Sequence, residues 1–199
     1  MLAYFMPDFN YGIITFIGTM LAFSMTCFLL HKCKGFLPAD QGREFAHDGK
    51  LSAGKPRGAG FIFILVFAVA YLLFGRLNIE RIIYVVLIIA SMLTGYLDDC
   101  AKNPWGEYKK GLLDLLIAVM VAITYINFNG CGLEFSALGI SVELNPIVLG
   151  LLIVILVWTS INVTNCADGV DGLSGTLTII SLATIYLLIE LQEGDADFS

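Results

Sequence analysis

Six long apolar stretches, separated by short polar segments, follow one another along the 199-residue chain. They cover residues 11–30, 58–75, 82–97, 111–128, 146–161 and 172–189. A helix needs roughly 20 apolar residues to cross the hydrocarbon core of a bilayer. Flanking Thr, Ser, Tyr and Trp side chains can complete the shorter stretches at the headgroup level. The pattern predicts an all-α, polytopic membrane helix bundle with six transmembrane helices in one domain, residues 1–199.

The connection between the fourth and fifth stretches, residues 129–145, has a different pattern. Its apolar side chains alternate with polar ones, at Leu133, Phe135, Leu138, Ile140, Val142 and Leu144. Alternation of this kind is typical of short paired strands. We therefore expect a small β-hairpin in this connection.

The composition supports a membrane protein, because 58% of the residues are hydrophobic and only 14% are charged. The five cysteines lack the spacing of a zinc site, so we interpret them as packing residues. The G-x4-G-K-[ST] motif of a P-loop is absent, which argues against soluble nucleotide hydrolysis. No nucleic-acid partner is expected.

The basic residues indicate an orientation. One set of connections, residues 31–57, 102–110 and 161–171, carries six, three and no Lys or Arg. The opposite side carries only Arg76 and Arg81. Because cytoplasmic loops are enriched in Lys and Arg, we predict cytoplasmic loops at about 31–57, 98–110 and 162–171, and both termini outside.

Two adjacent carboxylates, Asp98 and Asp99, end the third apolar stretch on the predicted cytoplasmic side. Two like charges at the end of an apolar helix repel each other and favour a bound cation. Magnesium prefers oxygen ligands and is usually held by one or two carboxylates together with substrate phosphates. The alternative is a solvated helix end that makes no special contact.

A second polar cluster lies between the last two apolar stretches. It has the spacing N-x2-N-x2-D-x2-D, and a glycine follows each aspartate; its members are Asn162, Asn165, Asp168 and Asp171. Carboxylates at the end of a membrane span are costly unless they meet water, a cation or a ligand. The cluster predicts a site for a polar or phosphorylated ligand at the membrane surface, although Asp-Gly is also common in ordinary turns.

Several lysines lie on the same predicted face. Lys102, Lys109 and Lys110 follow the aspartate pair, and Lys55 and Arg57 lie in the glycine-rich segment before the second apolar stretch. Lysine ammonium groups can contact phosphate oxygens as point charges. The alternative for these residues is cytoplasmic anchoring alone.

Four segments together resemble the polyprenyl-phosphate N-acetylhexosamine-1-phosphate transferases, and most of all their phospho-N-acetylmuramoyl-pentapeptide transferase branch. The segments are 54–60 (GKPRGAG), 95–102 (GYLDDCAK), 110–112 (KGL) and 162–174 (NVTNCADGVDGLS). The resemblance covers almost the whole chain. It implies a ten-helix bacterial plasma-membrane enzyme with its active site on the cytoplasmic face. The chain would then be the N-terminal part of that fold and incomplete by itself. A homodimer is also expected from the resemblance.

The resemblance further implies a reaction and roles for individual residues. The enzyme would transfer phospho-N-acetylmuramoyl-pentapeptide from its UDP form to undecaprenyl phosphate, with Mg²⁺ as cofactor and UMP as the other product. Asp98 would be the base or the nucleophile, and Asp99 would face the metal. The implied substrate-binding residues are Lys102, Lys110, Asn162, Asn165, Asp168 and Asp171, together with Lys55 or Lys50 in place of a family lysine.

Two other functions remain open on the sequence. A related enzyme could transfer phospho-N-acetylglucosamine from UDP-N-acetylglucosamine to undecaprenyl phosphate. A cation transporter could use the Asp and Asn side chains as ligands, but transporter sites lie near the middle of the membrane. All four Asp residues of the two clusters lie at predicted helix ends on one face, which favours a surface site.

Overall fold

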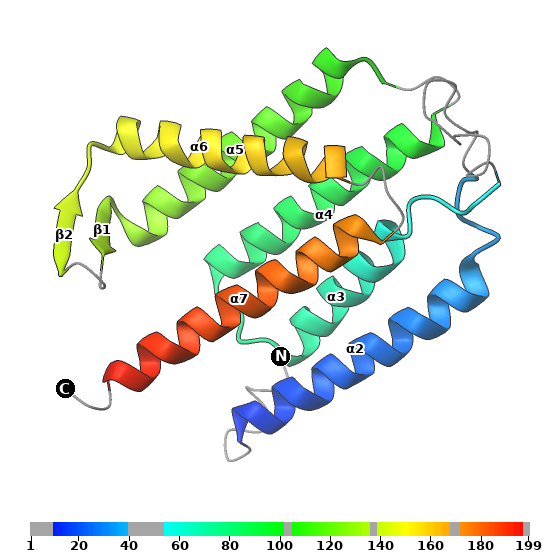
Figure 1. Cartoon of the computed structure of the whole chain (residues 1–199), viewed down its shortest axis with the longest axis horizontal. Coiled ribbons are helices and arrows are strands. Elements are labelled where there is room, and N and C mark those ends of the chain that lie inside the picture. Colours follow the sequence, from blue (N-terminus) through cyan, green and yellow to red (C-terminus); the bar gives the residue numbers. More distant parts are fainter. Residues whose placement is uncertain (1–9, 40–53, 102–104, 136–138, 168–171, 197–199) are drawn as a thin grey trace. The chain divides into compact units, whose positions relative to one another are not determined.

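The computed structural model describes residues 10–39, 54–101, 105–135, 139–167 and 172–196. The described part contains six helices and one hairpin (Figure 1). In chain order these are α2 (Tyr11–Cys33), α3 (Gly60–Phe74), α4 (Ile79–Cys100), α5 (Glu107–Asn129), β1 (Gly132–Phe135), β2 (Ile140–Glu143), α6 (Pro146–Ala167) and α7 (Leu173–Ala196). The chain divides into two compact units, residues 1–154 and 155–199, and the division falls within α6.

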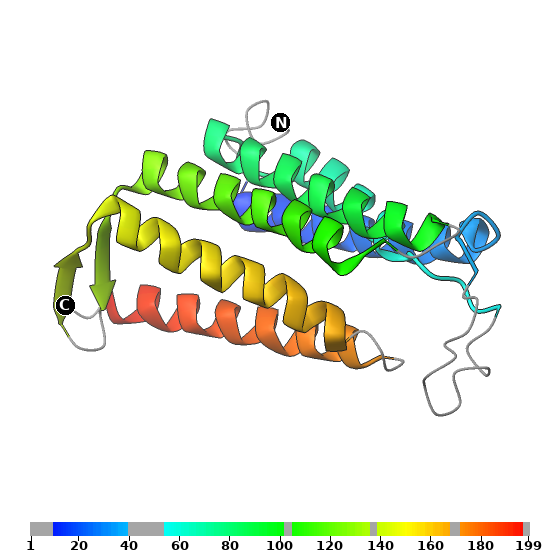
Figure 2. The same ribbon diagram turned by 90° about the horizontal axis from the view of Figure 1, so that it is seen from above.

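In the first unit, α2 packs against α3, α3 against α4, and α4 against α5. Figures 1 and 2 show these four helices side by side in chain order. Few of their side chains are buried; α5 contributes Ala118 and Ala122, one turn apart on the same face. Most large apolar side chains are exposed. An apolar surface of this extent fits contact with lipid rather than with water.

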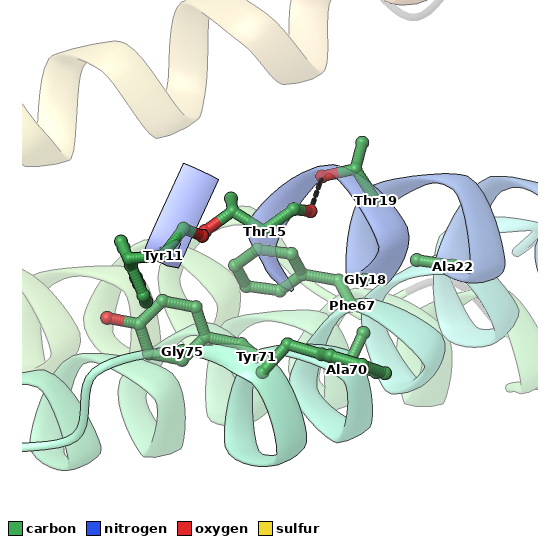
Figure 3. A pocket seen from close by; sticks show the side chains of 10 residues that line it. Tyr11, Thr15, Gly18, Thr19, Ala22, Phe67, Ala70, Tyr71 and Gly75 are labelled. Carbon is green, nitrogen blue, oxygen red and sulfur yellow. Dashed lines mark hydrogen bonds between the residues drawn. The ribbon is translucent and has the colours of Figure 1, made fainter. Parts of the chain in front are cut away.

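The contact between α2 and α3 is close because Gly18 has no side chain. A Cβ atom at Gly18 would lie 2.7 Å from Cγ of Phe74. An apolar pocket of about 320 Å³ lies beside this contact (Figure 3). The hydroxyl groups of Thr15 and Thr19 in its wall donate hydrogen bonds to backbone carbonyls one turn earlier in α2. The wall therefore presents few free polar groups.

Four helices, α2, α4, α5 and α6, are long and apolar enough to cross a membrane. The fifteen residues of α3 and the apolar part of α7, Leu173–Ile189, are shorter than the other spans. At 1.5 Å per residue, α3 covers only about 22 Å of the roughly 30 Å hydrocarbon core. All six predicted helices form, but six membrane crossings and the larger ten-helix fold stay predictions.

The predicted hairpin is confirmed. Strands β1 and β2 are antiparallel, with Gly132 opposite Glu143 and Phe135 opposite Ile140. Its position between α5 and α6 matches the alternating segment of the sequence. The second unit contains the end of α6 and all of α7, and a shallow pocket lies between Val163 and Thr164 of α6 and Ser174 and Leu177 of α7.

Candidate functional site

The predicted aspartate pair lies in the last turn of α4, where the chain turns toward α5. The Asp98 carboxylate is held by a residue that precedes α5: its Oδ1 accepts a 2.8 Å hydrogen bond from the backbone N–H of Trp105. Its Oδ2 lies 3.5 Å from Nζ of Lys110 in the first turns of α5. The side chains of Lys110 and Asp98 are 28% and 19% exposed. The ion pair of Lys110 and Asp98 is therefore partly shielded from water but open to a ligand.

The start of α5 also places partial positive charge close to Asp98. The first backbone N–H groups of a helix lack partners within the helix, and the helix dipole places partial positive charge there. Trp105 lies just before this helix start. The Nζ atom of Lys109 lies 3.5 Å from the centroid of the Trp105 ring. Lys109 is thus directed to an aromatic ring while Lys110 is directed to Asp98. The two adjacent lysines therefore have different surroundings.

The glycine-rich segment before α3 lies against the end of α4. A Cβ atom on Gly58 would lie 3.1 Å from the ring of Tyr96 and 3.7 Å from Oδ2 of Asp99. The Tyr96 ring stacks on Phe61 at a centroid distance of 4.4 Å. The backbone N–H of Arg57 donates a 2.7 Å hydrogen bond to the carbonyl of Pro38, which connects this segment to the end of the α2 region. These contacts place the segment beside the aspartate pair.

The backbone of this segment needs glycine at two positions, where φ is positive. Gly54 and Gly58 have φ angles of +85° and +70°, a region that costs an L-residue with a side chain about 1–2 kcal/mol. Lys55 and Arg57 lie between these two glycines, and both make interactions within the structure. The turns therefore keep two cationic residues within a short loop next to α4.

Gly58→Ala is expected to lower the thermal stability of the protein more than its matched control, Gly54→Ala. Both changes place a side chain at positive φ and should destabilise the protein by about 1–2 kcal/mol. Only the Gly58 variant also places a Cβ against Tyr96, since nothing lies within 4 Å of a Cβ at Gly54. Thermal melting of both variants checks this. Equal melting temperatures would show that the close approach at Gly58 does not matter.

The structure thus brings together three predicted site residues, Asp98, Asp99 and Lys110, with the Gly54–Gly60 segment that contains Lys55. Asn162 and Asn165 lie on the last turns of α6 in the second unit, so the helix extends beyond the end of the apolar stretch. Asn162 donates a 2.8 Å hydrogen bond from Nδ2 to the carbonyl of Trp158. Lys102, Asp168 and Asp171 lie outside the described residues. Their roles stay predictions.

Sequence reasoning missed two contributors to this site. The backbone of Trp105 fixes Asp98, and the ring of Tyr96 fills the space between Gly58 and Phe61. The first contact comes from a backbone N–H, which every residue except proline carries, so residue type gave no signal for it. No pattern in the sequence indicates the second, because an aromatic residue in an apolar helix is ordinarily a packing residue.

The two carboxylates of the site could provide part of the coordination shell of a magnesium ion. Asp98 and Asp99 provide oxygen ligands at one helix end, and magnesium typically needs one or two carboxylates while phosphates and water complete its shell. Within the described ranges no group of three or more His, Cys, Asp or Glu side chains could hold a metal by itself. An ion bound here would therefore depend on phosphate oxygens of a substrate.

The apolar helices and the charged cluster at their ends fit a membrane protein with a polar site at the membrane edge. Residues 81–198 match the model of the glycosyl transferase family 4. The chain belongs to this family, which confirms the resemblance seen in the sequence motifs.

Curated relatives agree with this assignment. A protein of Treponema pallidum (strain Nichols) named phospho-N-acetylmuramoyl-pentapeptide-transferase is 40% identical over 90% of this chain and 51% of its own length. A protein of the same name from Symbiobacterium thermophilum is 30% identical over 74% of this chain and 48% of its own length. One from Streptococcus sanguinis is 26% identical over 92% of this chain and 57% of its own length. The chain spans about half the length of these relatives. No solved structure matches it.

Proposed function

We propose that the protein transfers phospho-N-acetylmuramoyl-pentapeptide from its UDP form to undecaprenyl phosphate, releasing UMP. The observation that carries this proposal is the similarity to transferases of that name over 90% of the chain. The site supports it, because an aspartate pair, a lysine and a glycine-rich loop meet at the end of two apolar helices. We further propose that this face is cytoplasmic in a bacterial plasma membrane, on the basis of the lysine and arginine distribution.

In the proposed reaction, an oxygen of the lipid phosphate forms a bond to the sugar-linked phosphorus of the nucleotide sugar. The bond from that phosphorus to the UMP oxygen breaks, and UMP leaves with the electron pair. Charge collects on the phosphoryl oxygens, so positioning and electrostatic stabilisation dominate such a step. Magnesium, when bound, would neutralise part of this charge.

The residues of the chain have separate tasks in this proposal. Asp98 is fixed by the Trp105 N–H and lies next to a cation, so its carboxylate is oriented toward the site. It either takes the proton of the lipid phosphate or attacks the phosphorus itself. Attack by Asp98 breaks the bond to UMP and forms an acyl-phosphate intermediate, from which the lipid phosphate then takes the phosphosugar and frees the carboxylate. Asp99, with Asp98 beside it, would hold the metal ion, and Lys110 would contact phosphate oxygens once the substrates enter. Lys55 and Lys102 add positive charge for the pyrophosphate.

We assign the second polar cluster to the nucleotide sugar. In this proposal Asn162, Asn165, Asp168 and Asp171 shape the pocket, with Asp171 near the uracil. The motif's regular spacing and its match to the family support this assignment. A homodimer remains a prediction from the family resemblance.

Transfer of radiolabelled phospho-N-acetylmuramoyl-pentapeptide from its UDP form to undecaprenyl phosphate tests the proposal. The protein is assayed with and without Mg²⁺. UDP-N-acetylglucosamine is the competing donor. We expect magnesium-dependent lipid product only with the pentapeptide donor. Product only with the N-acetylglucosamine donor would assign the protein to the related transferase, and no product with either donor would reject a transferase function.

A further inference from the structure

Asp114 is the only charged residue that is buried in the described part of the chain. Its exposed fraction is 3%, in the second turn of α5. No hydrogen-bond donor among the described residues reaches its Oδ2 atom. An ionised carboxylate without a partner is strongly disfavoured in such surroundings. A residue of this kind therefore needs a cation nearby or a function that uses its charge.

The nearest cation in the sequence of the helix is Lys110, one turn before Asp114. Residues four apart in a helix lie on the same face, and opposite charges in this arrangement attract. Lys110 also lies 3.5 Å from Oδ2 of Asp98. That distance is long for a charge-assisted hydrogen bond, which is usually about 2.7–2.9 Å. Lys110 is therefore not tightly bound to Asp98 and shares a helix face with the buried Asp114.

We propose that Asp114 is a positioning residue that provides a second acceptor for the Lys110 ammonium group. Lys110 pairs with Asp98 in the unloaded site, and Asp114 favours its release from Asp98 when a divalent cation binds there, which leaves the ammonium group available to the phosphate oxygens. The inference rests on the proposed function, in which Asp98 and Asp99 face magnesium. Asp114 lies outside the four segments that carry the family resemblance. A role in positioning Lys110 would explain why a charged residue is buried there.

The physical reason concerns competition between two cations for one carboxylate. A metal ion can bind Asp98 only if Lys110 withdraws or stays at the cost of like-charge repulsion. A nearby negative charge at Asp114 attracts Lys110 and favours its withdrawal. Removing that charge leaves Asp98 as the main partner of Lys110, and the metal then has to displace a more firmly held ammonium group.

Asp114→Asn is therefore expected to weaken metal binding, and a double-mutant cycle with Lys110→Gln tests the cause. Mn²⁺ replaces Mg²⁺ as the probe, and the signal of free Mn²⁺ in electron paramagnetic resonance measures binding to the full-length natural protein. The site of interest is the binding that Asp98→Asn removes. We expect Asp114→Asn to raise the Mn²⁺ dissociation constant about 3- to 30-fold, which lies within the coupling found between residues that share a partner. In the Lys110→Gln background the same change should have an effect of less than about twofold.

Thr124→Val is the matched control. Thr124 is also buried on α5, and its hydroxyl donates to the carbonyl of Met120. This change disturbs a buried polar group of the same helix without removing a charge, so it should lower the melting temperature and leave Mn²⁺ binding unchanged. Asp114→Glu keeps the charge and should restore most of the Mn²⁺ affinity that Asp114→Asn loses.

The outcomes separate this inference from the proposed function. Equal weakening by Asp114→Asn in both Lys110 backgrounds, or no weakening in either, would overturn the role of Asp114. Absence of any Mn²⁺ binding that depends on Asp98 would remove the metal from the proposed function and the inference with it. Normal Asp98-dependent binding without phosphosugar transfer would overturn the reaction but leave the Asp114 cycle interpretable.

Discussion

Replacing Asp98 by Asn is expected to lower the rate of phosphosugar transfer by about 100- to 1,000-fold. The amide keeps the size of the side chain and can still accept from the Trp105 N–H, but it cannot act as a base or a nucleophile. It also no longer attracts Lys110 or a metal ion. Steady-state transfer with the full-length natural protein in detergent measures this effect, and thermal melting checks that the fold persists. Asp99→Asn should have an effect of similar size, through the loss of the proposed metal ligand.

Glu80→Gln is the control for these two changes. Glu80 lies in the first turn of α4, at the opposite end of the helix that carries Asp98, and accepts a 2.6 Å hydrogen bond from Nδ2 of Asn129. Its loss removes one negative charge from the same helix without touching the site. We expect transfer within about twofold of the unchanged protein, since changes outside such sites have small effects. Near-normal activity of both aspartate variants would reject the site.

Lys110→Gln is expected to have the second largest effect, a loss of about 10- to 100-fold in the rate of transfer. The magnitude corresponds to about 1.4–2.7 kcal/mol of lost charge stabilisation, within the range for a charge-assisted contact. Because the Lys110 ammonium group lies at the site and would meet the phosphates, its loss should lower kcat as well as kcat/KM. Measurements at saturating and limiting UDP-sugar separate the two constants.

Lys109→Gln is the matched control for Lys110→Gln. The two lysines are adjacent, but the Lys109 ammonium group lies over the ring of Trp105 and not against Asp98. We expect Lys109→Gln to change kcat by less than about threefold, because it removes an exposed cation–π contact worth about 0.5–1 kcal/mol. Equal losses in both variants would mean that only the overall positive charge of this loop matters.

The helix ends show where sequence reasoning succeeded and where it could not. Apolar stretches predicted six helices and the alternating segment predicted the hairpin, because burial in lipid requires a long apolar run and pairing in a strand produces an alternation, and a sequence displays both directly. The helix bounds needed the structure. The polar residues Asn162 and Asn165 continue α6 beyond its apolar part, since helical backbone hydrogen bonds do not depend on side-chain polarity.

Sequence motifs also indicated the aspartate pair, the lysines and the family, because these depend on residue type and spacing. Contacts across the bundle needed the tertiary structure. It decided that Lys110, not Lys109, faces Asp98 and that Gly58 approaches Tyr96 and Asp99. It also decided that Asp114 is buried. The physical reason is that orientation around a helix axis and the approach of two helices arise from packing between distant segments, which spacing along one segment does not record.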